Sequence, residues 1–300
     1  MKTSSFFNKS ILCILLTGLC NAAIAQKVAN VQQGNAWAPA SVKVDGKITD
    51  WGTSLKAYNK TVRLWYTVAN DDKNIYLAVE STDMDNNTKI LAGGISFTVN
   101  TAGKKKDKDA FIVTFPLISR TGGGHGGRGR RGGGFGGQQD TPDTAAILAQ
   151  QKQSLATAKE ISALGFKDIT DTLISIYNEY GIKAAANIDD KGNFVYELSI
   201  PLKMLEITAD NQKEMAYDIK VNGLQLNVNM KNIMLGGGGG GGFAVAGGGG
   251  GGRNGGGGGG GGGFGGGSAF GGGRNNSDVD DLTSPTDFWG KYTMATNPGK

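Results

Sequence analysis

The sequence predicts an all-β protein: an antiparallel β-sandwich, immunoglobulin-like or jelly-roll-like, with one inserted α-helix and two disordered glycine-rich loops. Apolar residues recur at every second position in several short segments, which is typical of strands with one buried face. One longer segment, 142–164, has an apolar pattern that fits a helix instead. Most of the 52 glycines fall into two tracts, at 120–140 and 236–277, whose few apolar side chains cannot offset the entropy cost of ordering them.

The composition outside these tracts is sufficient for one hydrophobic core. Of the 300 residues, 38% are hydrophobic, and the part of the chain without the glycine tracts has the size of an ordinary domain. We therefore expect a single domain at 42–295, which the two glycine-rich tracts interrupt. A polar lead-in at 26–41 precedes it.

Residues 1–25 have the pattern of an export signal peptide. Lys2 and Lys9 supply a positive start, the apolar run Ile11–Leu19 is too short for a membrane anchor, and Ala23–Ala25 matches the small-x-small pattern of a cleavage site. The sequence thus predicts an exported protein, periplasmic, cell-surface or secreted, with no transmembrane span in the mature chain. An uncleaved anchor and a lipidated cysteine are the alternatives.

The residue inventory argues against several functional classes. Both cysteines, Cys13 and Cys20, lie in the leader, so the mature chain has neither disulfide nor thiol chemistry. The single histidine, His125, lies in a glycine tract, and no serine-nucleophile or histidine-rich metal motif occurs in the sequence. A formal net charge of +5 does not by itself indicate a nucleic acid partner. We expect a protein that is not an enzyme and that does not bind nucleic acid.

The domain opens with a short strand, a turn and a hairpin. A strand at 42–44 leads into the turn Asp45–Gly46, where glycine permits a positive φ. Trp51 follows, and we expect its ring to close one end of the sandwich. Strands at 62–68 and 75–79 then alternate apolar and other residues and form a β-hairpin with one face in the core.

The next segments alternate between polar connections and strands. The stretch 81–88, STDMDNNT, is a predicted polar loop, and a strand is expected within 90–99. The lysine-rich stretch 104–109 follows as a solvated turn, with anion binding as the alternative, before a strand at 111–115.

The inserted helix and the remaining strands complete the sandwich. The helix at 142–164 starts with proline and aspartate, which favour a first turn, and Gly165 is its expected end. The remaining strands are expected at 172–177, 182–188, 194–200, 217–221 with a continuation at 224–228, and 288–294.

Three stretches carry a family resemblance. They are the opening VDGKITDWG with the following NDDKNIYLAVESTD, the later FVYELSIPLKML, and the closing TDFWGKYTMA. In this order they resemble the family 9 carbohydrate-binding modules and the wider DOMON-like sandwiches, over roughly residues 42–295. The resemblance implies a β-sandwich and a non-catalytic protein that recognises extracellular or cell-surface glycans. The partner that it implies is a polysaccharide or an oligosaccharide.

Sugar-binding sandwiches stack aromatic rings on the faces of pyranose sugars. Trp65 is the best candidate because the alternation of its strand points it away from the core, beside Arg63, and Trp37 is the second ring. The alternative is that the helix at 142–164 or a neighbouring strand covers Trp65. A different function is also open, in which the sandwich is a structural or adhesive envelope scaffold and the glycine-rich loops make the contacts.

A calcium site is the one metal site that the sequence favours. Asp83, Asp85 and Asn86 place hard oxygen ligands in one short loop, which suits a cation that takes six to eight oxygens. The family resemblance also implies a structural calcium ion somewhere in the fold. An ion-free polar loop is the alternative, and the sequence leaves the glycan and the oligomeric state open.

Overall fold

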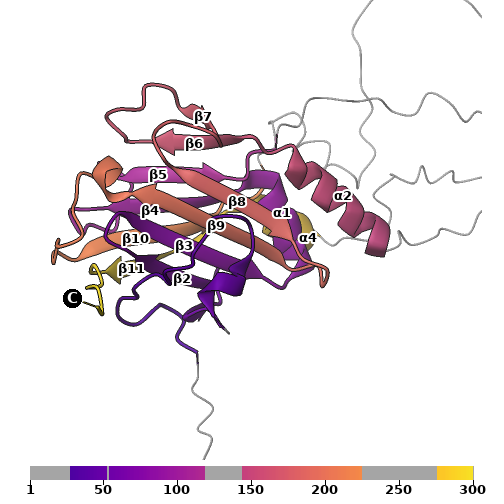
Figure 1. Ribbon diagram of the computed structural model, residues 1–300. Helices are drawn as coiled ribbons and strands as arrows, with labels where there is room; N and C mark the ends of the chain where they lie inside the picture. Colours follow the sequence, from indigo (N-terminus) through magenta and orange to yellow (C-terminus); the bar gives the residue numbers. More distant parts are fainter. Residues whose placement is uncertain (1–27, 53, 119–143, 225–275, 300) are drawn as a thin grey trace, which may run out of the picture.

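The protein forms two antiparallel sheets that face each other (Figure 1). The computed structural model describes residues 28–52, 54–118, 144–224 and 276–299. The five-stranded and the six-stranded sheet enclose one core, so the predicted all-β sandwich is confirmed. The predicted signal peptide, both glycine-rich tracts except the last two residues of the second, and the strand continuation at 224–228 beyond Leu224 lie outside the described residues.

Each sheet combines strands that are distant in the sequence. The five-stranded sheet has, in spatial order, β1 (Ala57–Asn59), β2 (Leu64–Asn70), β3 (Asn74–Ser81), β9 (Phe194–Pro201) and β8 (Lys183–Ile188). The six-stranded sheet has β11 (Thr286–Tyr292), β10 (Met215–Val221), β4 (Ile95–Asn100), β5 (Phe111–Phe115), β6 (Glu160–Leu164) and β7 (Leu173–Ser175).

The predicted hairpin forms, and the predicted face points into the core. Strands β2 and β3 pair so that Val68 lies opposite Leu77 and Tyr66 opposite Val79. These side chains are fully buried against residues of the other sheet such as Phe97. Complete burial of one such side chain contributes roughly 1.5–3 kcal/mol, so the alternating positions contribute substantially to the stability of the sandwich.

Helix α1 (Met84–Gly93) occupies the segment where a polar loop was expected. The Asp83 carboxylate caps it by accepting hydrogen bonds from the backbone N–H groups of Asp85 (3.0 Å) and Asn86 (2.9 Å). An aspartate at this position satisfies N–H groups that the first turn leaves without a partner. The loop prediction for 81–88 is therefore wrong, and the strand predicted within 90–99 begins only at Ile95.

The inserted helix is shorter than predicted. Helix α2 spans Thr144–Ala156, and the last part of the predicted 142–164 helix is strand β6. In β6 Ile161 and Ala163 are buried while their neighbours are more exposed, which is a period of two. Gly165 ends this strand, not a helix: it has φ +85°, and a Cβ there would lie 2.2 Å from the carbonyl oxygen of Ala110.

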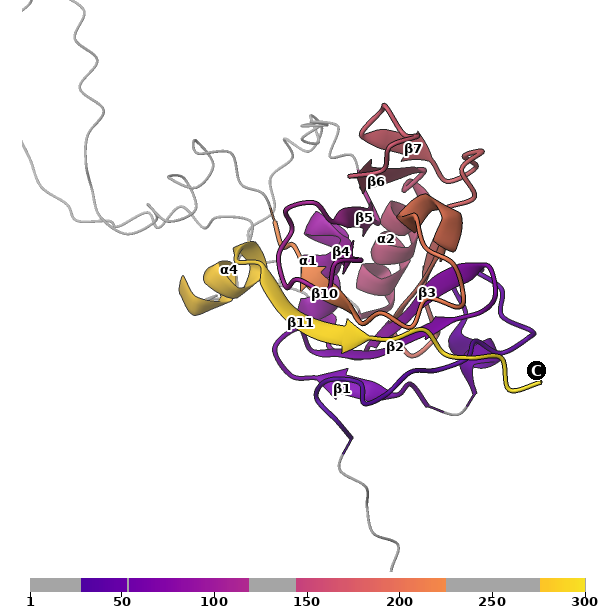
Figure 2. The same cartoon turned by 90° about the vertical axis from the view of Figure 1, so that its left-hand side faces the viewer.

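Three helices gather at one end of the sandwich (Figures 1 and 2). Helix α2 packs against β8 and α1, and α1 packs against α4 (Asn276–Thr283), which the sequence did not predict. Strand β8 forms one edge of the five-stranded sheet, and β1 and β2 lie on the side of the other edge. Helix α2 therefore does not cover Trp65, which lies on β2.

The N-terminal segment packs on the outer face of the five-stranded sheet. No strand forms at 42–44; instead Val42 and Val44 pack with Trp51 around Tyr76. Trp51 ends the short 3₁₀ helix η1 (Ile48–Trp51), and its ring meets that of Tyr76 edge-on at 6.0 Å. The ring thus covers the face of the sheet, and the prediction that it closes the end of the sandwich is wrong. A second 3₁₀ helix, η2 (Leu202–Leu205), follows β9.

A buried carboxylate joins two of the three sequence motifs. Glu197 on β9 accepts the Trp51 indole N–H at 2.7 Å on one oxygen. Its other oxygen accepts the backbone N–H groups of Asp45 (3.0 Å), Gly46 (2.8 Å) and Lys47 (3.1 Å). Burial raises the pKa of Glu197, and these donors oppose that effect by stabilising the ionised form. The Asp-Gly turn, the tryptophan and the Tyr-Glu pair are therefore parts of one structural contact.

Candidate functional site

A groove of about 450 Å³ opens where the end of β11 meets an N-terminal segment and the turn after β4. It lies at the end of the six-stranded sheet opposite to α1 and α4, because β4 begins and β10 ends beside those helices. The residues that line it are Val31, Gln32, Gln33, Gly34, Asn35, Lys105, Glu214, Trp289, Gly290, Lys291, Tyr292 and Thr293.

Buried hydrogen bonds fix the N-terminal segment that lines the groove. The side chain of Gln32 bonds to both backbone groups of Val68, each at 2.8 Å, and its backbone N–H donates to the Tyr66 hydroxyl at 2.8 Å. The Tyr66 hydroxyl lies 3.1 Å from that of Tyr217 on the other sheet. These buried, paired polar groups hold the N-terminal segment at one position relative to both sheets.

A second set of bonds fixes the chain beyond β11. The Tyr292 hydroxyl lies 2.7 Å from the side-chain oxygen of Asn70 and 3.0 Å from the carbonyl oxygen of Ala36. The same Asn70 oxygen accepts the backbone N–H of Ala295 at 2.7 Å. Hydrogen bonds therefore connect both walls of the groove to Asn70, the last residue of β2.

Trp289 is the aromatic side chain of the groove that points away from the core. Along β11, Gly290 and Tyr292 face inward, so Trp289 and Lys291 face outward. The ring of Tyr217 fills the space beside Gly290, where a Cβ would lie 2.1 Å from a ring carbon. The Trp289 side chain is partly buried and borders the hollow.

Polar side chains from three separate segments surround the ring. The Lys291 ammonium donates to the Glu214 carboxylate and to the carbonyl oxygen of Gly103, both at 2.8 Å. The side-chain amide of Asn35 donates to the carbonyl oxygen of Met294. The side-chain oxygen of Asn35 can still accept a hydrogen bond from a ligand. Among the ion pairs of the described residues, none includes Lys105.

Trp65 lies where the sequence predicts, on the outer face of the five-stranded sheet. It sits directly opposite Tyr58 on β1, and the two rings are 5.0 Å apart at an angle of 47°. Both residues are partly buried. This pair of rings is a second aromatic surface, and neither ring lines the Trp289 groove or the two grooves beside segment 201–213.

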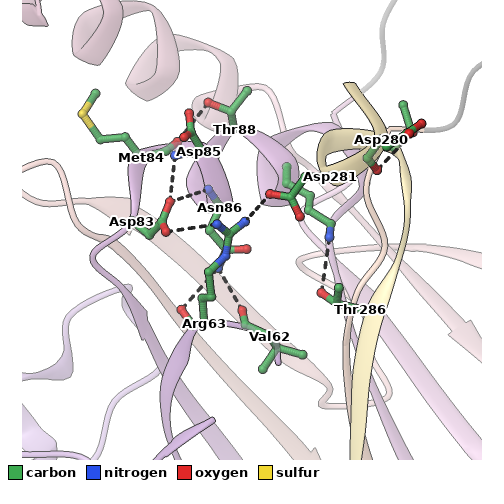
Figure 3. A network of polar contacts seen from close by, with 12 residues as sticks. Val62, Arg63, Asp83, Met84, Asp85, Asn86, Thr88, Asp280, Asp281 and Thr286 are labelled. Carbon is green, nitrogen blue, oxygen red and sulfur yellow. Dashed lines mark hydrogen bonds and ion pairs between the residues drawn. The ribbon is translucent and has the colours of Figure 1, made fainter. Parts of the chain in front are cut away.

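Arg63 does not lie free beside Trp65. Its guanidinium forms ion pairs with Asp83 at 3.3 Å and with Asp281 on α4 at 2.7 Å, as Figure 3 shows. Trp37 forms a β-bridge with Asn70. Asn70 lies five residues after Trp65 on β2, which at 3.3 Å per residue is a distance of about 16 Å. The three residues predicted to bind sugar are thus not brought together.

The predicted calcium ligands lie in the first turn of α1. Asp83 is engaged by the helix N-terminus and by Arg63, and the Asn86 amide N–H groups donate to the Val62 carbonyl (3.0 Å) and the Ser81 hydroxyl (3.2 Å). Across the described ranges, no group of three or more His, Cys, Asp or Glu side chains is placed to hold a metal ion. Calcium binding by Asp83, Asp85 and Asn86 stays a prediction without a ligand cluster to support it.

Sequence reasoning missed Trp289 as a functional residue. The alternation of Phe288, Gly290 and Tyr292 is the signal that points Trp289 outward, although from the sequence we predict only a closing strand for this segment. Its partners in the groove are remote in sequence, since segment 31–35 precedes it by more than two hundred positions. The sequence around Trp289 therefore does not indicate that residues 31–35 lie beside it.

Within the part of the chain that the structure describes, no helix has the length and apolar character needed to cross a membrane. Comparisons with the known protein families and with curated proteins find no match for this chain.

Proposed function

We propose that this is an exported, non-catalytic carbohydrate-binding protein and that the groove at Trp289 is its binding site. One observation carries the proposal: a partly buried tryptophan ring borders a preformed groove that polar side chains surround. The export signal and the family resemblance in the sequence support the same function, because both fit a protein that meets glycans outside the cytoplasm.

The chemistry of the groove suits a saccharide. A pyranose has apolar C–H faces and a rim of hydroxyl groups, so it requires an aromatic surface together with hydrogen-bonding groups. Trp289 supplies the surface, and Asn35, Gln33 and the Glu214–Lys291 pair supply donors and acceptors. Because hydrogen bonds already hold the N-terminal wall of the groove in place, little conformational entropy is lost there on binding.

The same lining favours binding over hydrolysis. Glycoside hydrolysis generally uses two carboxyl groups on opposite sides of the scissile bond. Among the described residues that line the groove, Glu214 is the only carboxylate, and it is paired with Lys291. The groove can therefore hold a sugar, but it does not have the pair of acids for cleavage.

The Tyr58–Trp65 pair is the second candidate position for the same function. Two partly buried rings 5.0 Å apart offer a stacking surface. Glu80 on β3, which lies opposite Trp65, accepts a hydrogen bond from Asn193 at 3.1 Å. We rank this surface second because at Trp289 an outward-facing ring, a groove and polar side chains from several segments occur together.

The test compares matched tryptophan variants in binding to a panel of soluble and insoluble glycans. We expect Trp289→Ala to weaken binding about tenfold or more, since loss of a central aromatic contact is typically costly, and Trp65→Ala to leave it unchanged. Both tryptophans are partly buried and face outward from a sheet, so each variant controls for the other. Thermal melting checks that both remain folded.

A deletion variant separates the scaffold alternative from this proposal. The backbone N–H of Leu224 bonds to the carbonyl oxygen of Leu282 at 2.9 Å, so the two flanks of the second glycine tract are already joined. A chain that lacks residues 236–273 should therefore fold and bind as the full chain does. Binding that disappears with this deletion, or that survives in Trp289→Ala, would contradict the proposal.

A further inference from the structure

We propose that the groove selects an acidic saccharide, a sugar ring that carries a carboxylate or sulfate group, and that Lys105 is the residue that recognises the anion. This inference rests on the proposed function and adds the class of ligand. It follows from the position of the lysine-rich turn, which the sequence predicts to be a solvated turn with anion binding as the alternative, and from the charges of the groove lining.

The turn that carries Lys105 is organised by a buried side chain. Asn100, at the end of β4, is 1% exposed. Its side-chain oxygen accepts the backbone N–H groups of Ala102 (3.1 Å) and Lys104 (3.2 Å), and its amide donates to the carbonyl oxygen of Lys106 (3.1 Å). The backbone on both sides of Lys105 is therefore held in one conformation.

The same turn is tied to the wall of the groove. Lys291 donates to the carbonyl oxygen of Gly103, and Gly103 packs so closely that a Cβ would lie 2.7 Å from the carbonyl oxygen of Glu214. Gly103 has φ +74°, which favours glycine. These contacts place Lys105 at the edge of the hollow that Trp289 borders.

The charges of the lining leave one cation uncompensated. Glu214 and Lys291 form an ion pair at 2.8 Å and neutralise each other. Lys105 is the remaining charged residue of the lining. Its flexible stem and compact ammonium can reach an anionic substituent of a sugar whose ring lies on Trp289. A charge-assisted hydrogen bond of this kind favours an acidic ligand over a neutral one of the same shape.

The experiment measures affinity for pairs of polymers that share a sugar backbone and differ in charge. The carboxylate arm uses polygalacturonate and its methyl-esterified form, and the sulfate arm uses dextran sulfate and dextran. We expect the full chain to bind the charged member of at least one pair about tenfold more tightly, because a hydrogen bond between two charged groups is stronger than one between neutral groups. The arm that shows the preference identifies the anion.

Three lysine variants assign the preference to one residue. Lys105→Gln should reduce the binding of the charged polymer to the level of its neutral form, and Lys105→Arg should retain the preference. Lys183→Gln is the control, since Lys183 is exposed on β8 of the other sheet. The preference of the full chain should also weaken as salt is raised, because the anion contact lies near solvent.

The outcomes separate this inference from the proposed function. Equal affinity for charged and neutral forms, or a preference that survives Lys105→Gln, overturns the inference while Trp289-dependent binding still supports the function. A preference that Lys183→Gln removes equally well would show only a general effect of positive charge, and overturns the inference too. Absence of any Trp289-dependent glycan binding overturns both.

Discussion

Asp218 lies on the outward face of β10, opposite Trp289, and only 3% of its surface is exposed. One of its carboxylate oxygens has no hydrogen-bond partner among the described residues. Burial raises the pKa of Asp218 to about 7, and the carboxylates of Asp287 and Asp107 add to the effect, while the charge of Lys220 opposes it. The folded chain therefore has a lower free energy of unfolding when Asp218 is ionised than when it is protonated.

The sign of the pH dependence follows from the raised pKa. The folded state holds the Asp218 proton up to about pH 7, whereas an ordinary aspartate releases it near 3.8. The folded state is thus favoured at low pH, and this advantage is lost as pH rises from about 4 to about 7. We predict that Asp218→Asn raises the free energy of unfolding by up to about 4 kcal/mol at pH 8 and by much less at pH 4.

Urea unfolding of the wild type and Asp218→Asn across this pH range measures the difference directly. Subtracting the two curves removes the titration of the other groups, which both proteins share. Asp210→Asn is a suitable control because Asp210 is a solvated surface carboxyl whose pKa is lowered by its local hydrogen bonds, not raised by burial. A difference between wild type and Asp218→Asn that does not change with pH would disprove the assignment.

At the scale of elements, Arg63 connects three parts of the chain. It precedes β2 with φ +52°, and its two ion pairs reach the N-cap of α1 and helix α4 (Figure 3). The Arg63 side chain is 31% exposed, so the ion pairs are partly screened and contribute little to global stability. The ion pair with Asp281 joins α4 to the residue that precedes β2.

We predict that Arg63→Ala increases backbone hydrogen exchange in α4 and lowers the global free energy of unfolding by less than about 1 kcal/mol. Exchange measured by mass spectrometry on peptides from 276–286 reports on the helix. Lys167→Ala, which breaks the ion pair with Glu206 at η2, is the matched control and should leave α4 unchanged. Unaltered exchange of α4 in Arg63→Ala would argue against this role.

Two of the incorrect element predictions concern short segments whose local sequence fits more than one structure. Segment 81–88 reads as a loop because its polar residues are common in turns, yet Asp83 uses that same property to cap a helix. Segment 160–164 fits either a helix or a strand, and its pairing with β5 decides for the strand. Local sequence therefore predicts the long hairpins well, whereas short segments depend on contacts that are distant in the chain.

At the scale of the whole molecule, the two ends of the six-stranded sheet differ. The end near α1, α2 and α4 also holds the flanks of the second glycine-rich tract, which are joined at Leu224 and Leu282. The opposite end holds the Trp289 groove. The prediction of a sandwich could be made from alternation alone, but the groove could not, because it forms only where residues 31–35, 105, 214 and 289–293 meet.

The chain itself provides the most direct probe of the central claim that the groove binds a glycan. It has four tryptophans, Trp37, Trp51, Trp65 and Trp289, so a nitrogen–proton NMR spectrum shows four indole signals that single substitutions can assign. On titration with a glycan fragment identified by the binding panel, we predict the largest shift for Trp289. Trp51, whose indole donates to buried Glu197, should not move.

The same titration tests the competing positions at once. A shift of the Trp65 indole with Trp289 unchanged would place the site on the five-stranded sheet. A spectrum in which saturating ligand leaves the Trp289 indole unmoved would contradict glycan binding in the groove.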